Sequence, residues 1–424
     1  MGAPTATALV VASMVGTGAF TTSGLLLRAL GSVQAVMLAW FVGGLIALCG
    51  ALAYGELVAA LPHNGGEYAL LSRIYHPAVG FVAGWTSLVV GFAAPVAASA
   101  LAFAAYARRF VPVPLSESMV ATVLIVVVTA VHLGRSHVSD RLQNALTALK
   151  IALIVLGVAV CAFVVDWQHA RTAVPQWGAL VASPRFAIGL IYVSFAYSGW
   201  NAAAYVAGEV CRPARNLPLS LMLGTTAVMG LYVALNAVIL AAAPASTLAG
   251  VVEVAQVAAA HLLGLGAALA VSVLVALGLL TTMGALTVTG PRIYEAMGRD
   301  YSALALLGRR HPERGPRYAT VLQSLLAVVM AQLAAFDALL TYIGFTLAIS
   351  AALTLAGVFV LRRREPALPR PYRTWGHPIS TTLALALTTW MAIYSIWERP
   401  WAAVAGLTTC ALGLLGYFWA AAKS

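Results

Sequence analysis

Two short segments of the chain place glycine beside hydroxyl and amide side chains in the middle of long apolar runs. They are residues 14–20, with the sequence MVGTGAF, and residues 195–201, with the sequence FAYSGWN. Glycine is a poor helix former, so each segment is expected to interrupt a helix. A break frees backbone N–H and C=O groups, which in hydrocarbon must face protein, water or a ligand. The alternative is that the small residues only let helices approach closely.

The expected helix ends define the chemistry of such a site. A half-helix that begins at Thr17–Gly18 presents free amides and the positive end of its dipole, which suit a carboxylate. Half-helices that end at Met14–Val15 and near residues 195–198 present free carbonyls, which suit an ammonium group. A ligand that carries both groups one carbon apart is an α-amino acid.

The elements that must hold these segments are membrane-spanning helices. Of the 424 residues, 62% are hydrophobic and 9% are charged, whereas soluble proteins contain about 25% charged residues. This composition excludes a soluble protein and predicts an all-α polytopic membrane protein with a lipid bilayer around it. Twelve apolar runs are long enough for transmembrane helices: 4–29, 35–61, 78–107, 117–133, 141–166, 185–208, 218–243, 257–290, 317–336, 338–361, 379–397 and 401–421.

The interrupted runs are the first and the sixth, which are equivalent positions of two five-span halves. This spacing is typical of transporters with a 5+5 inverted repeat, whose sites lie at broken helices. We therefore expect one transporter domain over residues 1–424, with repeats at 1–170 and 180–361 and two additional helices within 377–421. The pairing favours a binding site over close helix packing.

The net charge of +11 raises the question of nucleic acid, but the basic residues lie between apolar runs. If the N-terminus is cytoplasmic, 17 Lys and Arg residues fall on the inner side and five on the outer side, the latter being Arg28, Arg108, Arg109, Arg171 and Arg399. This asymmetry follows the positive-inside rule. We expect a multi-pass protein of the cell inner (plasma) membrane with both termini cytoplasmic and no nucleic-acid partner.

Lys150 is the only charge in residues 142–165. It lies about 12 Å along this run, near the middle of the membrane, where an ionisable residue indicates function. We expect Lys150 to take the place of a bound sodium ion and to donate hydrogen bonds to the carbonyls exposed at the first break. Snorkelling to the interface is the alternative. Glu56 and Glu209 are expected to pair with arginine at the cytoplasmic ends of spans two and six, with a proton relay as the alternative.

Five motifs give the chain a family resemblance: residues 15–20 (VGTGAF), 53–57 (AYGEL), 65–68 (GGEY), 195–201 (FAYSGWN) and 215–218 (RNLP). With these motifs the chain resembles the amino acid–polyamine–organocation (APC) transporters over its whole length. It is most similar to the L-type amino acid transporters (LAT family) and their bacterial relatives.

The resemblance implies the LeuT-like APC fold and sodium-independent transport or exchange of amino acids. It implies that Thr17 and Gly18 offer amides to the substrate carboxylate, that Met14, Phe195 and Ser198 offer carbonyls to the amine, and that Asn201 braces the second break. Phe195 also covers the site. The expected substrate-binding residues are Met14, Val15, Gly16, Thr17, Gly18, Phe195, Ala196, Ser198 and Asn201, with Lys150 as the coupling residue.

Two departures from the family pattern stand out. Ser198 occupies a position where many relatives have glycine, which narrows the pocket. Residues 108–117 lack the cysteine through which animal members link a heavy chain, so no disulfide-linked heavy chain is expected. The four cysteines of the chain are far apart and are assigned to packing.

The expected substrate is a small or medium neutral L-amino acid. The hydroxyls of Thr281 and Thr282 and the small residues of 91–94 are candidates for its side-chain pocket, and no acid stands on the spans expected to surround it. The alternatives are an amino acid sensor without transport and a carrier of cationic amino acids or amines. A membrane enzyme would need paired carboxylates, a metal set or a nucleophile with its base, and the sequence has none of these. No cofactor or metal is expected.

Overall fold

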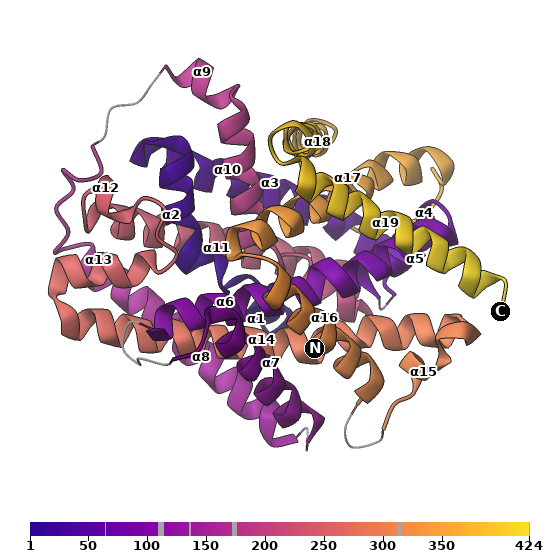
Figure 1. The fold of residues 1–424 in the computed structure, drawn as a ribbon. Helices are drawn as coiled ribbons and strands as arrows, with labels where there is room; N and C mark the ends of the chain where they lie inside the picture. Colours follow the sequence, from indigo (N-terminus) through magenta and orange to yellow (C-terminus); the bar gives the residue numbers. More distant parts are fainter. Residues whose placement is uncertain (64, 109–113, 135–136, 172–175, 312–314, 424) are drawn as a thin grey trace.

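The computed structural model describes residues 1–63, 65–108, 114–134, 137–171, 176–311 and 315–423, with the backbone alone for 137–144. The described residues are helical apart from turns and one isolated bridge between His311 and Gly315. Figure 1 shows the C-terminal helices α18 and α19 beside α17, and α7 and α8 at the lower edge of the view. Arg109, Arg135 and Arg314, which enter the charge count above, lie outside the described residues.

Among the described residues, seven helical runs are long and apolar enough to cross a membrane. They are α3 (Val33–Ala60), the run Pro77–Arg108, α11 (Pro213–Ala241), α14 (Leu265–Asp300), α17 (Phe336–Arg364), α18 (Ile379–Glu398) and α19 (Pro400–Ala421). The run Pro77–Arg108 consists of α5 (Pro77–Thr86), the π-helix η1 (Ser87–Ala93) and α6 (Ala94–Arg108). The pair α1 (Ala3–Met14) and α2 (Gly18–Leu30), bent by 42°, adds an eighth candidate.

Shorter helices occupy the other ranges in which the sequence predicts spans. They are α7 (Glu117–Leu133), α8 (His137–Cys161), α10 (Pro184–Tyr197) with the 3-10 helix η2 (Ala202–Glu209), and α16 (Arg317–Leu333). A helix therefore lies in each of the twelve ranges, while length and composition alone identify seven or eight crossings. The remaining short helices are α4 (Gly66–Ile74), α9 (Trp177–Val181), α12 (Ala245–Leu248), α13 (Val254–Leu263), η3 (Ser302–Leu304) and α15 (Ala305–Gly308).

The predicted start of the eighth span was wrong. A continuous helix over 257–290 was expected, but α13 ends at Leu263 and α14 begins at Leu265. Gly264 between them has a φ of 83°, a left-handed conformation that glycine adopts without steric cost. The helix α14 then continues through Pro291 to Asp300.

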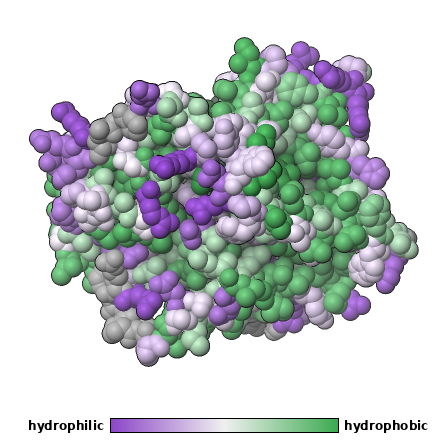
Figure 2. Space-filling view, turned by 45° about the horizontal axis from the view of Figure 1, so that its top comes forward, coloured by the Kyte–Doolittle hydropathy of each residue, from purple (hydrophilic) through white to green (hydrophobic). Residues whose placement is uncertain are grey.

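Large aliphatic side chains cover the outside of the molecule. Val127 on α7, Leu156 on α8 and Leu415 on α19 are each more than half exposed. Figure 2 shows hydrophobic residues over much of one face, with hydrophilic residues toward its margin and in one central patch. Exposed apolar surface of this extent is typical of a protein that lies in lipid.

A buried aromatic cluster holds the interior helices together. The Trp40 ring of α3 lies 5.9 Å from the Tyr197 ring of α10 and 5.5 Å from the Tyr232 ring of α11. Trp40 Nε1 donates to Ser23 Oγ of α2 at 2.9 Å, and Ser23 Oγ donates to Asn236 Oδ1 of α11 at 2.5 Å. The buried polar groups of the cluster are hydrogen-bonded to one another. The cluster therefore holds α2 and α10 against α3 and α11.

Candidate functional site

The first break lies where the glycine-containing segment predicts it. Helix α1 ends at Met14 and α2 begins at Gly18. The Phe20 amide donates to the Thr17 oxygen at 3.2 Å, whereas the amides of Gly18 and Ala19 have no carbonyl one turn earlier and are open to an outside acceptor. Thr17 of the break forms a 2.6 Å hydrogen bond through its hydroxyl to Ser99 of α6, which fixes the segment against that helix.

The second break also lies within its predicted segment. Helix α10 ends at Tyr197, and the chain resumes in η2 at Ala202. Gly199 has a φ of 97°, and a Cβ there would lie 2.6 Å from the Ser13 carbonyl oxygen. Only glycine allows the chain to turn this close to α1.

Two of the carbonyls expected to bind an ammonium group are already engaged. The Phe195 oxygen accepts from the Ser198 amide at 3.0 Å and from the Ser198 hydroxyl at 2.6 Å, so both of its lone pairs are used. The Met14 oxygen accepts from the Tyr232 hydroxyl at 2.5 Å and keeps one lone pair. The carbonyl oxygens that can still accept a hydrogen bond are therefore that of Met14 and the others in the last turn of α10.

The two broken helices are also in direct contact at Gly18. A Cβ on Gly18 would lie 2.4 Å from the Cα and 2.5 Å from the Cβ of Ala196. The first turn of α2 therefore packs directly on the last turn of α10, with no room for a side chain between them. This contact places the amides of one break next to the carbonyls of the other.

A cavity of about 190 Å³ lies at this contact. It is lined by eight of the nine predicted site residues: Met14, Gly16, Thr17, Gly18, Phe195, Ala196, Ser198 and Asn201. Val15 does not line the cavity. Of the expected side-chain pocket, Thr282, Gly91 and Phe92 line the cavity, whereas Thr281, Ala93 and Ala94 do not.

Part of the cavity wall is the π-helix η1, which the sequence analysis does not predict. It contributes Ser87, Gly91 and Phe92 to the wall. The wider turn of a π-helix disturbs the regular side-chain register, and such turns are common at functional sites. An i to i+5 turn leaves no clear periodic signal in a uniformly apolar run.

Lys150 lies behind the first break rather than in the cavity. Its Nζ donates to the Val15 oxygen at 2.6 Å, and the side chain is 3% exposed. A Cβ on Gly278 of α14 would lie 3.0 Å from Lys150 Cδ, so the stem packs against that helix. The predicted contact with the carbonyls of the break is present, and the snorkelling alternative is wrong.

The cavity also contains an acid that the sequence analysis overlooked. Glu67 of α4 lines it and is 6% exposed. Tyr54 of α3 donates to Glu67 Oε1, and Asn201 Nδ2 donates to the same oxygen at 3.2 Å. Burial raises the pKa of the Glu67 carboxyl, and the two hydrogen bonds offset this rise in part. This acid comes from α4, which lies between spans, and not from the spans that were expected to surround the substrate.

The glycine pair before Glu67 is the signal that could have located it. Gly65 and Gly66 have positive φ values of 116° and 55°. A Cβ on Gly66 would lie 2.3 Å from the Tyr205 ring of η2. The pair therefore lets α4 begin directly against the second break, which carries Glu67 to the cavity.

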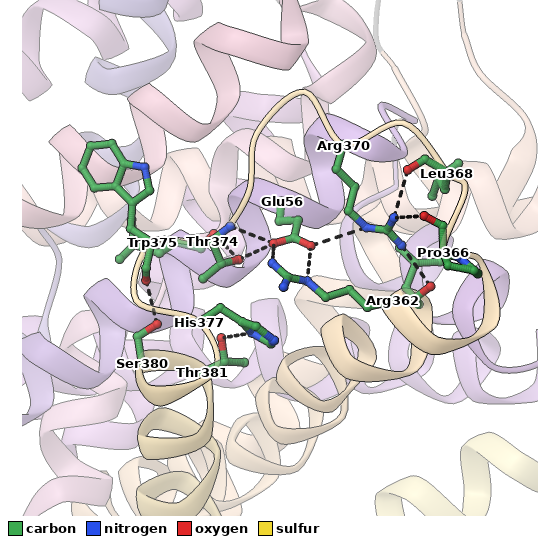
Figure 3. A network of polar contacts seen from close by, with 12 residues as sticks. Glu56, Arg362, Pro366, Leu368, Arg370, Thr374, Trp375, His377, Ser380 and Thr381 are labelled. Atoms are coloured by element: carbon green, nitrogen blue, oxygen red, sulfur yellow. Dashed lines mark hydrogen bonds and ion pairs between the residues drawn. The ribbon is translucent and has the colours of Figure 1, made fainter.

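Glu56 lies in a network of ion pairs and hydrogen bonds at the end of α3 (Figure 3). Arg362 of α17 binds it in a bidentate pair at 2.8 and 2.7 Å, and the Thr374 amide and hydroxyl donate to it at 2.7 and 2.8 Å. Arg370 Nε lies 3.6 Å away. The predicted pairing with arginine is confirmed for Glu56, and it leaves little capacity for a proton relay.

The same prediction was wrong for Glu209. Its side chain is exposed and forms no ion pair with the described residues. Its backbone oxygen accepts from the Met1 ammonium at 2.6 Å, so the N-terminus lies at the end of η2. Glu209 therefore lies at a helix end, as predicted, but without an arginine partner among the described residues.

Comparison with known proteins agrees with this architecture. A family model described as amino acid permease matches residues 1–411. The chain is 27% identical to the large neutral amino acids transporter small subunit 2 of Oryctolagus cuniculus, over 99% of this chain and 79% of that protein. It is 24% identical to the Asc-type amino acid transporter 1 of Mus musculus, over 99% and 81%. It is 26% identical to the serine/threonine exchanger SteT of Bacillus subtilis, over 89% and 86%.

Proposed function

We propose, because this chain belongs to the amino acid permease family, that it is a sodium-independent secondary transporter of small or medium neutral L-amino acids. The family consists of multi-pass membrane transporters, not enzymes. The transporter works by alternating access, as an exchanger or a proton-linked permease. The proposal includes twelve transmembrane helices, inverted repeats at 1–170 and 180–361, and two additional helices within 377–421. Both termini face the cytoplasm.

The observation that carries the proposal is the direct contact of Gly18 with Ala196 at the wall of the cavity. In this arrangement the substrate carboxylate binds the amides of Thr17 and Gly18. The ammonium group binds the Met14 oxygen and the carbonyls at the end of α10. Phe195 covers the ligand, and Asn201 braces the second break through its bond to Glu67.

Lys150 supports sodium independence. A bound cation near the first break would need the carbonyl oxygens that the break exposes. The Lys150 ammonium already donates to one of them, the Val15 oxygen. We therefore assign Lys150 the role of the coupling residue, which takes the place of a bound sodium ion and holds α8 against the first break.

The names of the similar proteins support a neutral substrate, since they include a large neutral amino acids transporter and a serine/threonine exchanger. The uncharged lining around Thr282, Ala285 and Leu347 fits such a ligand. One observation favours the second candidate, a carrier of cationic amino acids or amines: Glu67 offers a carboxyl to the cavity.

Counterflow in proteoliposomes tests the proposal. The purified single chain is reconstituted, loaded with each of the twenty amino acids in turn, and given the same radiolabelled amino acid outside, with and without sodium. We expect accumulation of neutral amino acids that does not depend on sodium and needs no second chain. Binding without counterflow would instead identify a sensor, and accumulation of arginine or lysine alone would identify a cationic carrier.

A further inference from the structure

We propose that Glu67 is the proton-binding site of the cavity, and that binding of a neutral amino acid is coupled to the uptake of one proton by Glu67. This inference rests on the proposed function. In the coupled step a proton from water forms an O–H bond with Glu67 Oε2 as the amino acid enters. When the amino acid leaves, the proton returns to water and the carboxylate is restored.

The hydrogen bonds of Glu67 leave one oxygen for this proton. The bonds from Tyr54 and Asn201 both end on Oε1. Within the described part of the chain, Oε2 has no hydrogen-bond partner, although the residue is buried and lines the cavity. Oε2 is therefore the atom that a proton or a ligand of the cavity can reach.

In the described part of the chain, no positive charge contacts the Glu67 carboxylate. Among the described residues no Lys, Arg or His nitrogen lies within 4.0 Å of its carboxylate, whereas Glu56 has two arginines. The packed elements present few ionisable groups: α3 presents the Tyr54 phenol and η2 the Tyr205 phenol. Helix α5 contains no ionisable side chain, and Arg362 of α17 is bound to Glu56. A carboxyl in such surroundings is shifted toward its neutral form.

Substrate binding shifts the Glu67 carboxyl further toward its neutral form. A neutral amino acid displaces water from the cavity and brings no net charge to compensate a carboxylate. Desolvation penalises the charged form of an acid, so the bound state has the greater affinity for the proton. By linkage, the amino acid then binds more tightly at low pH, and its affinity falls by up to tenfold per pH unit above the midpoint of the free protein.

Protonation of Glu67 also affects the second break, through the hydrogen bond from Asn201. Asn201, which donates to Glu67 Oε1, immediately precedes η2. A hydrogen bond to an ionised carboxylate is shorter and roughly twice as strong as one to a neutral carboxyl. The protonation state of Glu67 therefore sets how firmly the segment after α10 is held. At the first break, a hydrogen bond also links the chain to an ionisable side chain: Lys150 of α8 donates to the Val15 oxygen.

Equilibrium binding to the full-length purified protein tests the coupling. The probes are L-serine, L-leucine and L-arginine, measured from about pH 5 to about pH 9 for the wild type, Glu67→Gln and the control Glu117→Gln. Glu117 lies in a half-exposed ion pair with Arg108, away from the cavity. We expect the affinity of the wild type and of Glu117→Gln for the neutral probe to fall with rising pH. Glu67→Gln, which resembles the protonated form, should keep the low-pH affinity throughout.

Two results of this experiment would overturn the inference. An unchanged pH dependence in Glu67→Gln would assign the proton to another group. Preferential binding of L-arginine with an affinity that rises with pH would make Glu67 the counter-charge of a cationic substrate. If none of the probes binds the wild type, the proposed function fails, and the protonation of Glu67 is decided by the measurement below.

Infrared difference spectroscopy reads the proton without any substrate. On raising the pH, the wild type should lose the C=O stretch of a buried carboxylic acid, and Glu67→Gln should lack this change. Tyr54→Phe removes one donor to the ionised form, so its midpoint should move to higher pH. This variant also serves if Glu67→Gln does not fold. A carboxylic-acid C=O band with the same pH dependence in the wild type, Glu67→Gln and Tyr54→Phe would contradict the inference.

Discussion

The contact between the two broken helices makes Gly18→Ala the sharpest test of the site. A single methyl group at residue 18 would lie 2.4 Å from Ala196 Cα and 2.5 Å from Ala196 Cβ. Carbon atoms in ordinary contact are about 3.5–4.0 Å apart. The first turn of α2 and the last turn of α10 must therefore separate by about 1 Å, because the atom that is met belongs to the backbone and no rotamer can move it away.

The magnitude follows from this separation. Overpacking of a well-packed contact costs about 1–3 kcal/mol. A ligand whose carboxylate binds one broken helix and whose ammonium binds the other must draw them back together, so this cost appears in binding. Since about 1.4 kcal/mol corresponds to a factor of ten, we expect the affinity for the amino acid to fall on the order of 10- to 100-fold.

The assay is equilibrium binding of a radiolabelled amino acid to purified wild type and variants, with the melting temperature measured in parallel. Gly157→Ala is the matched control, because a Cβ there has no atom within 4 Å. Gly16→Ala should be intermediate, since its Cβ would meet the Thr282 side chain at 3.3 Å. An affinity of Gly18→Ala within threefold of the wild type, with the same melting temperature, would refute the reasoning.

Three further substitutions probe other parts of the account. Ser198→Gly removes the hydroxyl that binds the Phe195 oxygen and should widen acceptance toward bulkier neutral amino acids; an unchanged rank order in counterflow competition would place selectivity elsewhere. Lys150→Met removes the donor to the Val15 oxygen and should reduce counterflow far more than substrate affinity, so full transport would limit Lys150 to packing. Arg362→Met leaves the buried Glu56 carboxylate without its bidentate partner and should destabilise the protein by about 3–5 kcal/mol; the melting temperature should fall, whereas the exposed Arg363→Met should leave it unchanged.

Local sequence encodes the helix breaks, which is why they could be predicted. Gly16, Gly18 and Gly199 weaken the helix wherever the rest of the chain lies, so α1 ends and α2 begins at the expected residues. A buried lysine likewise needs an acceptor, and the first break was expected to expose carbonyls. The Val15 contact follows from that requirement.

Tertiary packing decides what the sequence did not predict. The Phe195 carbonyl oxygen accepts from the Ser198 amide and hydroxyl, and these hydrogen bonds depend on the conformation of the chain after the break. Glu67 reaches the cavity because α4, which lies between two predicted spans, packs inward against the second break. The break at Gly264 was missed because leucine and alanine continue on both sides of it, so hydropathy does not change there.

The central claim is that one ligand joins the two broken helices through its carboxylate and its ammonium group. The most direct measurement is competition in sodium-free counterflow between a transported amino acid, its methyl ester and its deaminated acid. We predict that only the intact amino acid competes, because each analogue loses the group that one break binds. Equal competition by the ester or by the deaminated acid would contradict the claim that both breaks hold the substrate.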